Sequence, residues 1–196
     1  GLQPSAAAQW FRQAGDRARD AHAYADAAQH YGNAVEQHSV ANDPLGTCKA
    51  SISWGRALSY SDPPGAALVM KKALELAEFS SDQPAQADAL RVLSGTYNQM
   101  GKYHDAWDTA TKGAVIAETC DLPEVLADCL STAAWAAQRC GDVMASQRHA
   151  LQSVFVAEQL GNPHILAHAL LRASDAHNGL QAFDDARAFA RRCLTV

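Results

Sequence analysis

The chain repeats itself with a period of about 40 residues. One set of positions recurs at steps of 39 or 40: Tyr24, Pro63, Tyr103, Val143 and Phe183. A small residue follows each of them three positions later: Ala27, Ala66, Ala106, Ser146 and Ala186. A second, independent set keeps the same spacing: Pro44, Pro84, Pro123 and Pro163. Two sets with one period predict about five copies of one structural unit.

The stretch from Leu90 to Glu118 indicates what that unit is. Apolar residues recur at steps of three and four on both sides of Gly101, which is the period of an amphipathic helix. Two such helices joined by a short turn form an αα-hairpin. The stretch resembles a tetratricopeptide repeat (TPR), and the matching positions are Leu93, Ser94 (where the family usually has glycine), Tyr97, Tyr103, Ala106 and Ala110. The resemblance implies an all-α fold, a right-handed α-solenoid of about five stacked helix-turn-helix hairpins.

The sequence predicts a single TPR-like repeat domain over residues 1–196, with hairpins at about 4–37, 44–77, 84–118, 123–160 and 163–196. Each periodic proline follows a residue that suits a helix start: Asp43, Asp82, Asp121 and Asn162. The sequence ends in the fifth hairpin without a polar capping helix. We therefore expect a fragment of a longer protein, or a last hairpin that packs on a partner or on a second copy as a homodimer.

Composition excludes several classes of function. A net charge of −5 and a pI near 5.9 argue against direct nucleic-acid binding. No apolar run is long enough to span a membrane, and no leader is visible. Five cysteines make an odd count without a C-x-x-C pair, which is not a disulfide framework, so we expect a cytoplasmic protein. Cys129, Cys140 and Cys193 occupy expected core positions, and Trp10 and Tyr103 belong to the expected inner stripes of their helices.

No constellation of residues predicts catalysis. The sequence contains no phosphate-binding glycine loop, nucleophile elbow or H-E-x-x-H pattern. His164 and His168 have metal-ligand spacing but no obvious third ligand, and surface histidines are the simpler interpretation. We expect no enzyme activity, no metal and no cofactor.

The inner face of such an array is the expected binding surface. In stacked hairpins the first helices line the concave side, and the side of each helix opposite its core stripe faces the groove. That side carries the predicted peptide- or ligand-binding residues: Arg12, Arg19, Asp88, Arg91, Asn98, Asp128, Trp135, Gln138, Arg139, His168, Asp175 and Asn178. Arginine, amide and aromatic side chains suit a peptide or a partner helix. The alternative is that these residues only solvate the helices.

The segment E-x-L-G-N-P, from Glu158 to Pro163, and the repeat length of about 40 residues look like those of the helical sensor arrays in bacterial signalling and transcriptional regulators. This similarity implies a sensor or assembly arm that binds a protein, a peptide or another domain of its own chain. The predicted groove contains no lysine, which argues against the acidic-tail clamp of TPR co-chaperones. Two alternatives remain beside a dimerisation module: a small-molecule (inducer) receptor around Arg91, Asn98, Trp135 and Gln138, or a metal protein using His164 and His168.

Overall fold

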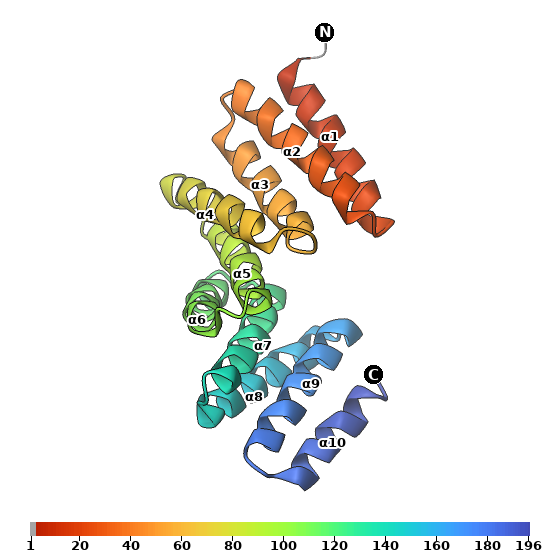
Figure 1. Ribbon diagram of the computed structural model, residues 1–196, viewed down its shortest axis with the longest axis vertical. Helices are drawn as coiled ribbons and strands as arrows, with labels where there is room; N and C mark the ends of the chain where they lie inside the picture. Colours follow the sequence, from red (N-terminus) through yellow and green to blue (C-terminus); the bar gives the residue numbers. More distant parts are fainter. Residues whose placement is uncertain (1–2) are drawn as a thin grey trace. The chain divides into compact units, whose positions relative to one another are not determined.

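The computed structural model describes residues 3–196, and the described part of the chain consists of ten helices joined by short turns (Figure 1). The predicted start of the domain, residues 1–2, lies outside the described residues. The chain divides into two compact units, residues 1–100 and 101–196. The helices of the first unit are α1 (Pro4–Asp20), α2 (Tyr24–Val40), α3 (Pro44–Leu58), α4 (Pro63–Phe79) and α5 (Gln83–Gln99). Those of the second are α6 (Tyr103–Thr119), α7 (Pro123–Arg139), α8 (Val143–Leu160), α9 (Pro163–Gly179) and α10 (Phe183–Cys193).

Side-chain caps and prolines fix where several helices begin. The Asp43 carboxylate accepts a hydrogen bond of 2.9 Å from the backbone N–H of Gly46, and Asp82 caps α5 in the same way. Asn162 caps α9 ahead of Pro163. Such caps satisfy N–H groups that have no partner within the helix. The prediction for Asp121 was wrong, because its backbone is left-handed, with φ of 53°, and Leu122 takes the cap position.

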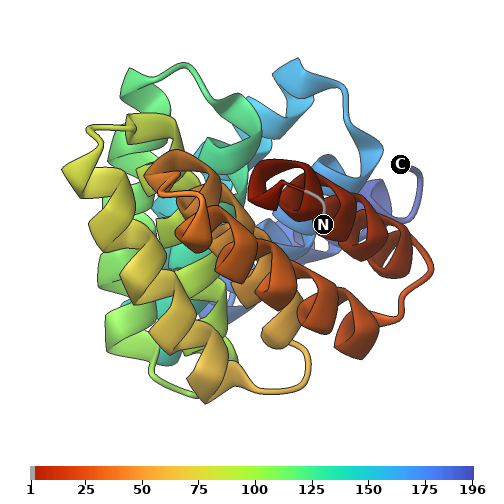
Figure 2. The same ribbon diagram turned by 90° about the horizontal axis from the view of Figure 1, so that it is seen from above.

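Within each unit a helix packs against its neighbours in sequence, and α1 and α2 lie side by side in both views (Figures 1 and 2). Odd-numbered helices also meet across hairpins, α3 with α5 and α7 with α9. Among the described residues, no comparable packing joins α2 with α4, α6 with α8 or α8 with α10. The pairs α3 with α5 and α7 with α9 therefore form a packed side of their units, and the even-numbered helices stand apart.

Alanine dominates the core of both units. Fully buried alanines lie on successive helices, including Ala27, Ala66, Ala134 and Ala150. Serine fills the same role in places: the Ser131 and Ser153 hydroxyls lie 2.8 Å apart, and Ser153 donates to the Ala127 carbonyl. Small side chains let the helix backbones approach closely, so the hairpins pack together although most of the side chains buried between them are small.

Two expectations about buried residues were wrong. Trp10, predicted to face inward from the first helix, is 62% exposed, because Ala8 and Gly15 form the buried side of α1. Of the three cysteines expected in the core only Cys129 is buried, whereas Cys140 and Cys193 are half-buried. All five cysteines are free thiols. No described helix has the length and apolar character needed to cross a bilayer.

We predict opposite effects for two glycine-to-alanine substitutions in the first unit. A Cβ at Gly15 would lie 2.7 Å from Cε1 of Tyr31, a buried ring whose hydroxyl is bonded to Asp16, so Gly15→Ala should destabilise the chain by roughly 1–3 kcal/mol. A Cβ at Gly95 meets nothing within 4 Å, so Gly95→Ala should stabilise α5 by about 0.5–1 kcal/mol. Denaturant unfolding measures both, and a Gly15→Ala protein as stable as Gly95→Ala would contradict this account of the packing.

Candidate binding surfaces

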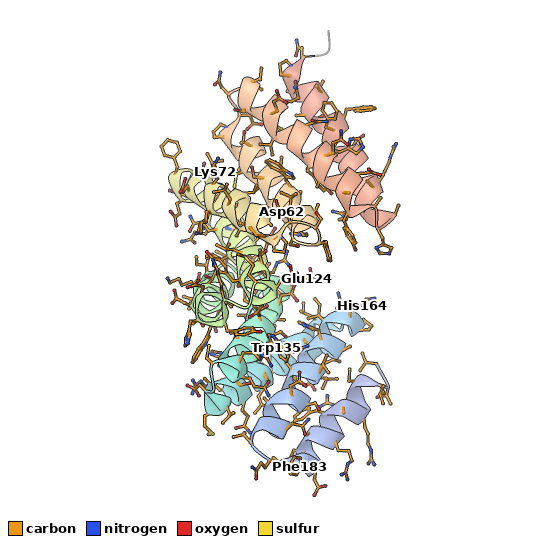
Figure 3. All side chains as sticks on the ribbon, viewed as in Figure 1. Asp62, Lys72, Glu124, Trp135, His164 and Phe183 are labelled. Atoms are coloured by element: carbon orange, nitrogen blue, oxygen red, sulfur yellow. The ribbon has the colours of Figure 1, made fainter. Side chains whose placement is uncertain are left out.

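Two arginines on different helices flank the Trp135 ring. The guanidinium of Arg172, from α9, lies 4.6 Å from the centre of the ring, and that of Arg139, from α7, lies 5.4 Å from it. Figure 3 labels Trp135 on α7. Each guanidinium is within the distance at which a cation is attracted to an aromatic face. We call Trp135, Gln138, Arg139, His168, Arg172 and Asp175 the Trp135 cluster.

One hydrogen bond between α7 and α9 and one within α9 hold this cluster in place. The Gln138 amide donates to the Asp175 backbone carbonyl at 2.9 Å, and Arg172 Nη1 donates to the Asp175 carboxylate at 3.0 Å. The Arg172 side chain is only 16% exposed, and this burial lowers its pKa, an effect that the Asp175 charge opposes. Arg172 is thus a guanidinium largely removed from water and fixed against a tryptophan.

His168 lies one turn before Arg172 on α9. Its ring reaches solvent, but protein surrounds it on its other sides. This partial loss of water, followed by the charge of Arg172, lowers the pKa of His168, whereas the Asp128 carboxylate acts to raise it. His168 is therefore held toward its neutral form, in which one ring nitrogen donates and the other accepts a hydrogen bond.

Arg139 extends the cluster to the beginning of α6. Its guanidinium lies 5.2 Å from the centre of the Tyr103 ring, and its Nη2 is 3.4 Å from the Tyr103 hydroxyl. The exposed Arg139 side chain therefore lies near two aromatic rings. The surface of α7 and α9, with the start of α6, presents one tryptophan, one tyrosine, two guanidiniums and several hydrogen-bonding groups.

The first unit carries a charge network between α3 and α5. Arg56 Nη2 donates to both carboxylate oxygens of Asp88, at 3.0 and 3.1 Å, and Arg91 donates to the same carboxylate at 2.6 and 3.0 Å. Burial lowers the pKa of Arg56 more than Asp88 raises it. The two arginines share one carboxylate and link helices that are neighbours on the packed side of the unit.

A hollow of about 430 Å³ adjoins this network. The Tyr24 and Tyr60 rings are stacked on one wall, with centres 4.0 Å apart and planes inclined by 14°. Arg19 lines it as well, and it is paired with Asp16 at 3.3 Å and with Asp20 at 3.0 Å. The buried Tyr31 hydroxyl donates to Asp16 at 2.7 Å, and burial, aided by that bond, raises its pKa to about 12. The hollow thus combines a flat aromatic wall with charged groups of both signs.

The structure brings some of the predicted residues together and leaves others apart. On the second unit it groups Trp135, Gln138, Arg139, His168 and Asp175, with the Asp128 charge acting on His168. Asn178 is exposed at the end of α9. On the first unit, Asp88 and Arg91 are in contact, Arg19 lines the hollow, Asn98 is half-buried on α5, and Arg12 is exposed on α1. The role of these residues in binding stays a prediction.

Several residues of these surfaces were absent from the predicted set, among them Arg172, Arg56 and Tyr103. Arg172 lies four residues after His168 and three before Asp175, so helical spacing alone could have placed it beside them. Arg56 occupies the position of α3 that Asp16 occupies in α1, counted from Pro44 and Pro4. Tyr103 was assigned to the core stripe of its helix, and its ring contacts the exposed Arg139 instead.

Metal ligands do not gather on either unit. Within residues 3–196, no three His, Cys, Asp or Glu side chains are placed to share a metal ion. His164 is exposed in the first turn of α9 (Figure 3). His168 belongs to the Trp135 cluster.

Comparison with known proteins shows the class of fold. No family model and no curated protein sequence matches the chain. Among solved structures, a Rap protein complexed with Competence and Sporulation Factor has a TM-score of 0.84 at 11% identity, and the match covers 100% of this chain and 55% of the Rap chain. BtubC from P. vanneervenii has a TM-score of 0.82 at 14% identity, covering 98% and 80%. TPR-like repeats of a putative kinesin light chain from Podospora anserina have a TM-score of 0.78 at 13% identity, covering 100% and 96%.

The chain therefore has the TPR-type fold, and the predicted all-α solenoid of helical hairpins is confirmed. It spans about half the length of the Rap protein. At identities this low the likeness concerns the fold alone, because one fold carries many functions.

We predict that the neighbours of His168 control its titration. Arg172→Met should raise the pKa of His168 by removing a nearby positive charge, and Asp128→Asn should lower it further. The exposed Arg187→Met, on α10, is the matched control and should leave it unchanged. NMR of the histidine ring protons against pH measures each value. As the pH is lowered, His168 binds its proton at a higher pH in the unfolded chain than in the folded chain. His168 should therefore reduce the free energy of unfolding as the pH falls below about 6.5. An unchanged pKa of His168 in Arg172→Met would contradict the predicted effect of the Arg172 charge on this ring.

Proposed function

We propose that the chain is a protein- or peptide-binding scaffold, and that the surface of α7 and α9 around the Trp135 cluster is its binding site. The observation that supports this most is the position of Trp135, a half-buried ring close to two guanidiniums, of which Arg172 is held in place by a hydrogen bond to Asp175. Tryptophan, tyrosine and arginine contribute most of the energy at protein interfaces, and their fixed positions reduce the entropy that binding costs.

The chemistry of the surface suits a peptide main chain. Arg139 can donate to carbonyl oxygens, His168 can donate and accept, and Trp135 offers apolar area for a side chain of the peptide. The structurally similar Rap protein is known in complex with Competence and Sporulation Factor, which supports a binding role for this type of fold. Following the resemblance in the sequence, we further propose that the scaffold is the sensor or assembly arm of a larger bacterial regulator.

The first test needs no knowledge of the natural partner. Peptides selected from a random displayed library on the wild-type protein should lose at least about 30-fold in affinity for Trp135→Ala, equivalent to about 2 kcal/mol. Trp10→Ala removes a more exposed tryptophan from α1 and should bind the same peptides normally. Peptides that lose affinity only for Trp10→Ala, or for neither variant, would contradict the proposed site. Sedimentation of the same samples reports self-association, the dimer alternative.

The hollow of the first unit supports a second candidate function, the binding of a small molecule. Its aromatic wall and its two arginines suit a planar ligand with polar edges. A compound found by thermal-shift screening should stabilise the wild type and Trp135→Ala equally and should fail to stabilise Tyr60→Ala. Ligands that act equally on all three proteins would exclude the hollow as their site.

A further inference from the structure

An apolar trough lies between α6 and α8, over α7. The two helices do not pack against each other within the described chain. Two hollows of about 550 and 520 Å³ occupy the gap, and both are lined by Thr111 and His149, so they form one continuous trough. Leu126 and Leu130 of α7 contribute to its floor.

The walls of the trough carry apolar side chains that are unusually exposed to solvent. Val115 of α6 is 58% exposed, and Leu151 and Phe155 of α8 are 41% and 62% exposed. His149 adds to the apolar character, because burial lowers its pKa and keeps it neutral. A contiguous apolar patch with polar ends is typical of an interaction surface.

The two ends of the trough carry opposite charges. Glu118 lies beside the end formed by the last turns of α6, and Arg148 lies at the other end, near the beginning of α8. Neither forms an ion pair within the described residues. Asp108, which shares the end with Arg148, is already paired with Lys112 at 2.7 Å. Each end of the trough therefore keeps one charge available for a partner.

The length and the charges together specify one kind of occupant. From His104 to Glu118, α6 rises by roughly 21 Å, the length of a helix of about 14 residues. A helix carries partial positive charge at its N-terminus and partial negative charge at its C-terminus. A helix can lie along the trough in two directions. One of them places the free N–H groups of its N-terminus at the Glu118 carboxylate and the free carbonyls of its C-terminus at the Arg148 guanidinium.

We propose that this trough binds one amphipathic helix of a partner protein, with its apolar stripe on Val115, Leu151 and Phe155. The helix runs antiparallel to α6 and α8, with its N-terminus at Glu118 and its C-terminus at Arg148. In this direction the dipole of the bound helix also opposes the dipoles of α6 and α8. These two helices run parallel to each other, because each is antiparallel to α7.

The trough is separate from the Trp135 cluster. Leu126 and Trp135 are nine residues apart on α7, about two and a half helical turns, so they project from opposite sides of that helix. The same unit can thus bind a peptide on one side and a helix on the other, and the two proposals can fail independently.

The probe is a synthetic helix of about 15 residues with both ends blocked and no charged side chains, alanine- and glutamine-rich, with leucines at positions i, i+4, i+7 and i+11. Val115→Ser and Phe155→Ser should each weaken its binding at least tenfold, as measured by fluorescence anisotropy. Leu68→Ser and Phe79→Ser change apolar residues of α4 that are at least as exposed, and they are the matched controls. Equal loss in the controls, or no loss in the trough variants, would overturn the proposal.

The direction is tested separately. A spin label at the N-terminus of the probe should broaden NMR signals around Glu118 more than those around Arg148. Exchanging the charges, as Glu118→Arg with Arg148→Glu, should reverse that preference. Broadening centred on Arg148 in the wild type would refute the stated direction. A chain that dimerises without the probe, and becomes monomeric with Phe155→Ser, would assign the trough to self-assembly instead.

Discussion

Close approach between helices, made by small side chains, is the constraint on which the rest of the structure depends. Alanines are fully buried on nearly every helix, and Gly15 and Gly55 lie against the Tyr31 ring and the Met70 side chain. Helices this close leave little room for large apolar residues between them. Trp10, Phe155 and Val115 are consequently exposed, and Trp135 is free to stack against arginines. The same packing that forms the hairpins thus supplies the surfaces available for binding.

The packing also determines what kind of surface each side offers. Odd-numbered helices meet across hairpins, so their polar side chains come within reach of one another, as Gln138 does with Asp175 and Arg56 with Asp88. Even-numbered helices stand apart, which leaves a gap with the apolar side of α7 at its floor. One arrangement of helices therefore gives a polar, aromatic surface on one side of α7 and an apolar trough on the other.

Local signals in the sequence predicted several helix starts well, because one or two residues determine where those helices begin. Pro44 with the Asp43 cap is an example. The face of a helix was also predictable from spacing, which grouped Trp135, Gln138 and Arg139 before any contact was known. Arg172 was missed although it has helical spacing to His168 and Asp175, and Trp10 was assigned to the core because spacing could not decide which of two adjacent positions turns inward. The pairing of Arg172 with Trp135 depends on contact between α7 and α9, and the sequence alone gives no measure of that contact.

The central claim is that a peptide binds over Trp135, and NMR of the indole N–H signals tests it most directly. The four tryptophans give separate signals that single substitutions assign. On addition of a selected peptide, the Trp135 signal should shift progressively to saturation while the Trp10 signal stays in place. A peptide that saturates the protein and leaves the Trp135 signal unmoved would contradict the claim.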